Sequence, residues 1–195
     1  MSAAPISLAD VTSAADQTYR WSPNGFLRAY EAGAFDARVE LIDGEVVPVV
    51  IGEWHGETAF RIGGILRDVA GGIVTGSTLS AGDSLPDPDC WVRRAGAEPA
   101  GQLSDRLSVW KPADVLLVVE VSDESVMRDL TVKPAIYGSA GYPTYWVITR
   151  DAIYEHTDPT AAGYRTRTEY RRGERIGLRY AGTELSVGEL LGPVD

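Results

Sequence analysis

The residues best suited to do chemistry lie close together in one stretch of the chain. Glu120 stands in an otherwise aliphatic run, VLLVVEV at residues 115–121, which is typical of a strand buried on both faces. A buried carboxylate is costly unless it meets a cation, a metal ion or an open site at the strand end. Asp129, Lys133 and Tyr137 follow at intervals of four, which would align them on one face of a helix. The stretch therefore predicts an acidic site with a lysine nearby.

The elements around Lys133 are marked by proline and glycine. Because a proline inside a helix removes a hydrogen bond, we expect the ordered helix to begin at Pro134, with Lys133 just before it. The helix should end near Gly141, and TYWVIT at residues 144–149 predicts the next buried strand. Lys133 would then lie at the start of an element that packs back toward the strand of Glu120.

Asp89 is the best candidate for a second acidic residue. It opens the segment CWVRR at residues 90–94, which is predicted to be a strand, whereas Asp87 is flanked by prolines and is expected in a turn. Asp114 is rejected because six residues of strand would separate it from Glu120 by roughly 20 Å, too far to share one ion. Asp89, from a neighbouring strand, is therefore the predicted partner of Glu120; the alternative is that it only ends a turn.

Glu40 and His55 are weaker candidates. Glu40 belongs to a hairpin predicted by the dipeptide Asp43-Gly44, and its side chain points away from the apolar side of its strand, which is typical of a solvent-facing residue. His55 lies on the apolar stripe of a helix predicted over residues 53–69. A histidine in that position is more often a hydrogen-bonded core residue than a metal ligand.

The composition is that of one globular domain. The chain has 195 residues, of which 44% are hydrophobic and 24% charged. We expect residues 1–19 to form a flexible polar tail and residues 20–195 to form the domain. The lone Cys90 excludes an internal disulfide and a cysteine-based zinc site, and no apolar stretch approaches membrane-spanning length. The N-terminus lacks the basic start and apolar core of a signal peptide, so we expect a cytoplasmic location.

The net charge of −10 argues against nonspecific affinity for nucleic acid, because lysine and arginine drive phosphate binding by displacing counterions. Its distribution is uneven. Residues 150–180 hold seven arginines and five acids. These arginines could form a DNA-binding track or could be solvated charges on hairpin strands.

The C-terminal third predicts antiparallel strands that extend the sheet. The segments AIYEHT, YRTRTEYRR and RIGLRY alternate in polarity, with turn signals at Asp158-Pro159 and at Gly173. A short helix over SVGELL closes the chain. His156 lies among these strands and is expected to be structural.

The ordered set of motifs resembles the Uma-two family of endonucleases, within the restriction-endonuclease-like PD-(D/E)xK superfamily. The resemblance rests on the buried strand with its acid, Asp-x-x-x-Lys-Pro-x-x-Tyr and Gly-x-Pro-x-Tyr-Trp, and it extends to RVELIDGEVV at residues 38–47, to His55 and to PDPD at residues 86–89. It covers roughly residues 20–190. It implies an α/β fold with a restriction-endonuclease-like core, in which a mixed β-sheet is flanked by helices, with an N-terminal helix and hairpin and C-terminal antiparallel strands.

The resemblance also implies an activity. The protein would be a metal-dependent phosphodiesterase, an endonuclease that hydrolyses DNA with water activated by Mg²⁺ or Mn²⁺. Asp89, Glu120 and Lys133 would be catalytic, and the backbone carbonyl of Val121 would join Asp89 and Glu120 in holding the metal. Glu40 and His55 would be further active-site residues.

One departure from the superfamily pattern is informative. Ser122 stands where the short motif has its lysine, so Lys133 can serve only if it folds back toward the carboxylates. The chain has only one other lysine, Lys111, so the match at Lys133 is not a product of lysine-rich composition.

The alternative function is a noncatalytic dimeric binding or interaction domain that retains the nuclease fold, which the acidity of the chain favours. Lys133 would then form only a surface ion pair, with Asp129. A homodimer is expected in either case, through the C-terminal strands and the long loop of residues 94–111.

Overall fold

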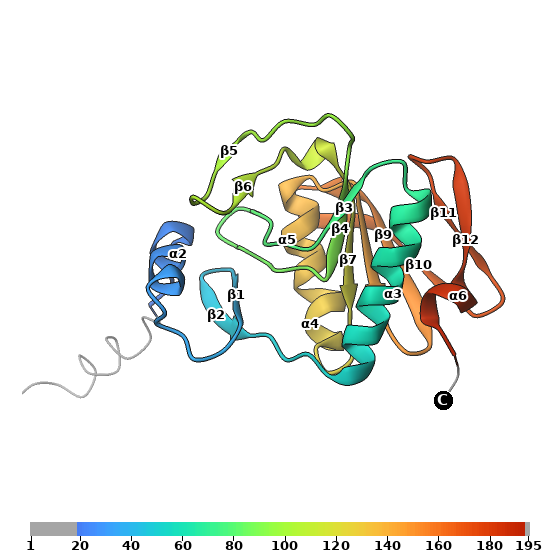
Figure 1. Cartoon of the computed structure of the whole chain (residues 1–195), viewed down its shortest axis with the longest axis horizontal. Coiled ribbons are helices and arrows are strands. Elements are labelled where there is room, and N and C mark those ends of the chain that lie inside the picture. The colour runs from blue at the N-terminus through green and yellow to red at the C-terminus, as the bar shows by residue number, and fades with distance from the viewer. Residues whose placement is uncertain (1–18, 194–195) are drawn as a thin grey trace, which may run out of the picture.

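The computed structural model describes residues 19–193, so the predicted tail lies, apart from Tyr19, outside the described residues. At the centre is a sheet of six strands in the order β10-β9-β8-β7-β4-β3 (Figure 1). Strands β7 and β8 are parallel, and the other neighbours are antiparallel. The sheet is therefore mixed, as the sequence predicts.

The strands of this sheet are β3 (Ile73–Thr75), β4 (Cys90–Arg93), β7 (Val115–Val121), β8 (Thr144–Ile148), β9 (Ala152–Thr160) and β10 (Gly163–Arg171). Three small hairpins pair β1 (Val39–Ile42) with β2 (Glu45–Pro48), β5 (Gly101–Gln102) with β6 (Ser108–Val109), and β11 (Arg175–Leu178) with β12 (Thr183–Ser186). The helices are α2 (Pro23–Glu31), α3 (Glu53–Val69), the 3-10 turn η1 (Pro112–Asp114), α4 (Val126–Thr131), α5 (Lys133–Ala140) and α6 (Val187–Leu191).

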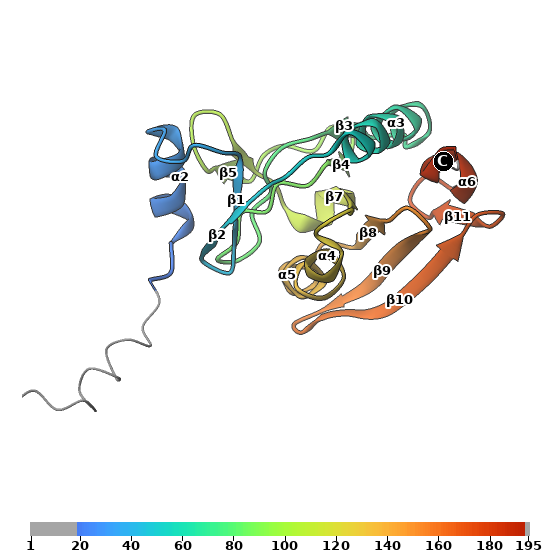
Figure 2. The same ribbon diagram turned by 90° about the horizontal axis from the view of Figure 1, so that it is seen from below.

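Helices cover both faces of the sheet, as the view from below shows (Figure 2). Helix α3 packs on one face, where Leu117 and Val119 of β7 meet Ile62 and Leu66 in the larger core cluster. Helix α5 packs on the other face with a cluster rich in tyrosine. Because side chains alternate along a strand, Glu120 faces the α5 side. No helix within residues 19–193 is long and apolar enough to cross a membrane.

The N-terminal elements form as their caps and turns predict. Ser22 caps α2 by accepting a hydrogen bond from the Gly25 amide, and a proline occupies the first turn. Asp43 and Gly44 both have positive φ, 48° and 75°, as a tight two-residue hairpin turn requires. The predicted hairpin is confirmed over β1 and β2.

The chain breaks between α4 and α5, next to Pro134. Lys133 is the first residue of α5, one position earlier than predicted, and Gly141 ends the helix in the left-handed conformation with φ of 88°. The break places Lys133 at the sheet-facing start of α5.

The turn predicted at Asp158-Pro159 is wrong. Strand β9 continues through both residues, and the pairing passes from Pro159↔Tyr164 to Thr157↔Thr166, which leaves Asp158 unpaired. Asp158 has a φ of 59°, a left-handed conformation that aspartate tolerates, so the turn-like signal marks a local irregularity within the strand that leaves its register unchanged.

The prediction that all the C-terminal strands extend the sheet is only partly right. Strands β9 and β10 do extend it, whereas β11 and β12 pair only with each other and form a separate hairpin at the side of the molecule (Figure 1). Helix α6 follows with Ser186 as its N-cap. The long loop of residues 94–111 contains the small hairpin of β5 and β6.

His156 is a buried residue that packs among aromatic side chains, which agrees with the expected structural role. Its ring packs against those of Tyr145 and Tyr164, at centroid distances of 5.5 and 5.8 Å, and its Nε2 has no hydrogen-bond partner among the described residues. Burial, aided by the charge of Arg167 on β10, lowers the pKa of His156 to about 4.

The low pKa of His156 predicts a pH-dependent stability. The unfolded imidazole takes up a proton near its ordinary pKa of 6.5, but the folded one does so only near 4. The stabilising contribution is therefore complete above pH 6.5 and is lost as the pH falls toward 4. Urea unfolding between pH 4 and 7 measures this effect. The free energy of unfolding should fall with pH in the wild type, and this fall should be smaller in His156→Gln. The same pH dependence in both proteins would contradict the prediction.

The close approach of α5 to β10 predicts a second stability effect. A Cβ added to Gly138 would lie 2.3 Å from the backbone carbonyl carbon of Gly163, so neither main chain could stay in place. We expect Gly138→Ala to lower the free energy of unfolding by about 3 kcal/mol, as overpacking does.

The matched control for this variant is Gly64→Ala in α3, where an added Cβ meets nothing within 4 Å. Alanine there should raise stability by up to about 1 kcal/mol because it favours the helix. Urea unfolding of both variants makes the comparison. Equal effects of the two substitutions would refute the contact between α5 and β10.

Candidate active site

The six residues predicted from the sequence line one pocket of about 280 Å³. The pocket lies where the ends of β4 and β7 meet the start of α3, the helix α4 and the connection between β2 and α3. The predicted residues that it brings together are Glu40, His55, Asp89, Glu120, Val121 and Lys133. Their roles remain predictions.

Asp89 and Glu120 are neighbours across two strands. The antiparallel pairing of Cys90 with Val119 places Asp89, one residue before β4, beside Glu120. The Val121 amide donates a hydrogen bond of 2.7 Å to Asp89 Oδ2, which fixes the carboxylate against β7. The alternative, that Asp89 only ends a turn, does not account for this contact.

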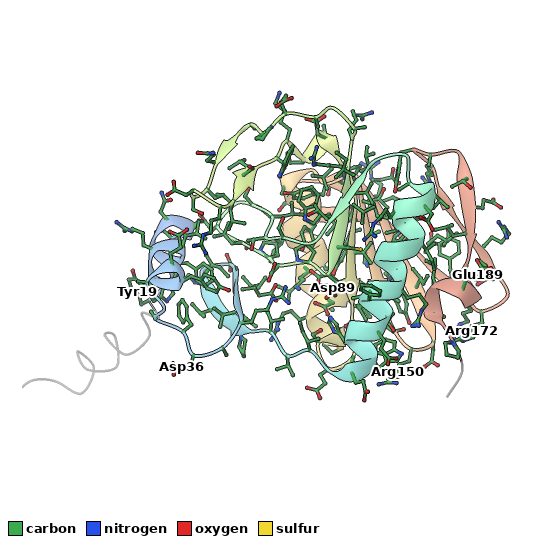
Figure 3. The ribbon with its side chains drawn as sticks, viewed as in Figure 1. Tyr19, Asp36, Asp89, Arg150, Arg172 and Glu189 are labelled. Atoms are coloured by element: carbon green, nitrogen blue, oxygen red, sulfur yellow. The ribbon has the colours of Figure 1, made fainter. Side chains whose placement is uncertain are left out.

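His55 holds the other oxygen of Asp89. A hydrogen bond of 2.6 Å joins His55 Nε2 to Asp89 Oδ1, and both side chains are about nine-tenths buried. Figure 3 shows Asp89 beside α3, the helix that carries His55. His55 is thus hydrogen-bonded, as a core histidine would be, but its partner is an acid of the pocket.

Glu120 is bound through one of its two oxygens. Its Oε1 accepts hydrogen bonds from Lys133 Nζ at 2.9 Å and from the Tyr137 hydroxyl at 3.0 Å, whereas Oε2 accepts none from residues 19–193. Burial raises the pKa of Glu120 to about 8; Lys133 opposes the rise, and the charges of Asp129, Asp89 and Glu40 add to it.

Lys133 is shared by three carboxylates. Its Nζ lies 2.9 Å from Glu120, 3.2 Å from Glu40 and 3.4 Å from Asp129, and the residue is only 4% exposed. Burial lowers the pKa of a lysine, but the three carboxylates outweigh it and raise that of Lys133. A surface ion pair is therefore the wrong description. The lysine does fold back toward the carboxylates, as the departure at Ser122 requires.

Glu40 is part of this group and does not face solvent. It is 4% exposed, and its Oε2 also accepts a hydrogen bond of 3.2 Å from the Asp87 amide. The hairpin of β1 and β2 lies over the end of the sheet, where Leu41 bridges Leu85. Tertiary packing therefore turns a face that looks solvent-exposed in the sequence into a wall of the pocket.

Three residues of the site were not predicted to be catalytic or to bind the metal. Tyr137 binds Glu120, Asp129 binds Lys133 and is only 1% exposed, and Asp87 lines the pocket while its carboxylate pairs with Arg38 at 2.6 Å. The interval of four that joins Asp129 and Tyr137 to Lys133 was a signal for the first two. Asp87 belongs to the PDPD segment, but its flanking prolines favoured a turn over a site residue.

Comparison with known proteins assigns the chain to a family. The family model Uma2, described as "Putative restriction endonuclease", matches residues 26–187. The chain belongs to the Uma2 family. The description of the family and the fold both support a nuclease.

A solved structure has a similar fold. The chain is similar to the "putative nuclease belonging to DUF820" from Anabaena variabilis ATCC 29413, with a TM-score of 0.63 and 13% sequence identity over 87% of this chain and 97% of that one. At that identity the similarity shows the fold alone. No curated protein matches the chain.

The donors in this Uma2 pocket suit a hard cation. Within residues 19–193 no three side chains of His, Cys, Asp or Glu form a ready-made metal cage. Magnesium, however, is usually held by one or two carboxylates together with water and substrate phosphate. Asp89 and Glu120 supply two such carboxylates, and Glu120 Oε2 takes no hydrogen bond from the described residues. The residues present therefore fit Mg²⁺ or Mn²⁺.

The buried position of Lys133 predicts a large stability effect. Lys133→Ala would leave three buried carboxylates without their cation, so we expect a loss of about 3–5 kcal/mol. The loss should shrink at low pH, where the carboxylates become protonated. Lys111, the other lysine of the chain, is exposed, and Lys111→Ala should change stability by less than about 0.5 kcal/mol. Urea unfolding at pH 8 tests both variants, and equal small effects would contradict the buried cluster.

Proposed function

We propose that this Uma2 protein is a metal-dependent phosphodiesterase, an endonuclease that hydrolyses DNA with water activated by Mg²⁺ or Mn²⁺. The observation that carries the proposal is the pairing of Lys133 with Glu120 at 2.9 Å in the pocket that Asp89 also lines. Two adjacent carboxylates and one ammonium are the groups that this reaction needs. They come from three separate elements of the fold.

Asp89, Glu120 and the carbonyl of Val121 would hold the ion. When bound, Mg²⁺ or Mn²⁺ polarises a phosphoryl oxygen and lowers the pKa of a coordinated water. The Val121 amide and His55 already fix both oxygens of Asp89, so this carboxylate would not have to reorganise during the reaction. Glu120 is fixed on one side and keeps its Oε2 for the ion.

Lys133 would stabilise the charge that develops on the phosphoryl group. Its ammonium is held by carboxylates on several sides, which fixes its position before substrate arrives. Tyr137, which donates to the same oxygen of Glu120, would orient that carboxylate. Glu40 and Asp129 would serve as positioning residues that keep Lys133 charged.

The acidity of the pocket supports a role for a cation in substrate binding. Six carboxylates and two cationic side chains line it. A phosphodiester would be repelled by this surplus of negative charge unless a divalent ion offset it. DNA binding should therefore depend on the metal more than on the protein surface.

Glu120→Gln tests the function most directly. The substitution keeps the size of the side chain and removes its charge, so we expect Mn²⁺ binding to weaken on the order of tenfold or more and plasmid nicking to fall by about a hundredfold. Isothermal titration of Mg²⁺ and Mn²⁺ and nicking at low salt measure the two effects.

Glu124→Gln is the matched control, because Glu124 lines the same pocket but is exposed and makes no ion pair with a described residue. It should leave both measurements nearly unchanged. Thermal melting of each variant excludes unfolding as the cause. A wild type that binds neither ion, or that binds but cleaves no nucleic acid, would refute the enzyme and favour a noncatalytic binding domain.

A further inference from the structure

Arg128 is a cation in the pocket that the proposed reaction does not use. It belongs to α4, lines the pocket and is partly exposed. Although Asp123 and Glu124 line the same pocket, the side chain of Arg128 makes no ion pair or hydrogen bond with any residue of the described range 19–193. An arginine that stays unpaired among so many acids retains all its donors for a ligand.

The other cations near the pocket are occupied. Lys133 is buried among three carboxylates. Arg38 pairs with Asp87 at 2.6 Å. Arg150 makes two hydrogen bonds to Asp123 and stacks over the ring of Trp54. Among the described residues that line the pocket, Arg128 is therefore the cation best able to bind a substrate anion.

Arg128 also differs in position from the proposed catalytic group. The next residue, Asp129, turns inward to Lys133, and successive side chains of a helix leave it about 100° apart, so Arg128 leaves α4 in a different direction. Lys133 and Glu120 are at most 5% exposed, whereas Arg128 is partly open to solvent. An anion on Arg128 would thus lie farther out than one on the buried carboxylates and Lys133.

We propose that Arg128 binds a phosphate of the substrate strand other than the one that is cleaved. A guanidinium fits a phosphate with two parallel hydrogen bonds, and a second phosphate exists only in a polynucleotide. Arg128 thereby makes the site selective for nucleic-acid strands over small phosphodiesters. This inference rests on the proposed phosphodiesterase function and adds a substrate-selecting residue to it.

The test compares two substrates. Arg128→Gln should raise KM for a labelled oligonucleotide duplex about tenfold, the loss expected for one charged contact, and leave kcat nearly unchanged. With bis(4-nitrophenyl) phosphate, which has a single phosphate, kcat/KM should stay within about twofold of wild type. Arg128→Lys should recover only part of the loss, because an ammonium cannot bind a phosphate through two parallel bonds.

Arg67→Gln is the control, since Arg67 is exposed on α3 and does not line the pocket. It removes the same charge and should leave KM for the duplex within about twofold. An equal loss from Arg67→Gln would mean that net charge alone acts, which overturns the proposal. An equal loss on both substrates from Arg128→Gln overturns it too, because Arg128 would then act at the cleaved phosphate.

A binding measurement separates failure of this inference from failure of the proposed function. The labelled duplex is titrated with protein in Mn²⁺ at several salt concentrations, and fluorescence anisotropy gives Kd. Because Arg128→Gln loses one phosphate contact, it should bind the duplex more weakly. The slope of log Kd against log salt concentration should fall by about 0.9. If wild type binds the duplex but cleaves neither substrate, the proposed function fails. Weaker binding by Arg128→Gln than by wild type would still support a phosphate contact at Arg128. Identical binding by wild type and Arg128→Gln overturns the role of Arg128.

Discussion

The structure depends on one buried ammonium shared by three carboxylates. Lys133 reaches Glu120 of β7, Glu40 of β1 and Asp129 of α4, so a single charge joins the sheet, the N-terminal hairpin and the helix pair. Each acid would be costly to bury alone. Because all three require the same cation, none of these elements can shift without exposing an unpaired charge.

Local structure is adapted to this cluster. The break between α4 and α5 starts a new helix at Lys133, and Ser122 donates a hydrogen bond of 2.8 Å to the oxygen of Asp129 that does not face the lysine. Behind the cluster, the contact between Gly138 and Gly163 lets α5 lie directly on the strand hairpin. A bulkier residue at either glycine would move α5, and the lysine with it.

The same negative surplus that holds Lys133 would also favour the binding of a second cation in the pocket. Three carboxylates around one ammonium leave an excess of negative charge. Burial disfavours the charged form of Glu120 and so raises its pKa. A divalent ion would relieve both. Binding and stability would then be linked, because an ion that binds only the folded protein stabilises it. This link reconciles a strongly acidic protein with membership in a nuclease family: the ion, and not the net surface charge, would draw the phosphate in.

The sequence alone determined the elements whose signals are local. The aliphatic run of β7, the turn residues Asp43 and Gly44, and the helix end at Gly141 specify their own structure, because backbone conformation and side-chain alternation act over a few residues. The ordered motifs also identified the family and the residues that line the pocket. Only the tertiary structure decided that Glu40 is buried and that β9 continues through Asp158. It alone showed that Asp129 and Tyr137 complete the cluster around Lys133 and Glu120. Burial and charge pairing depend on what a distant element places opposite a side chain, and that is set by packing.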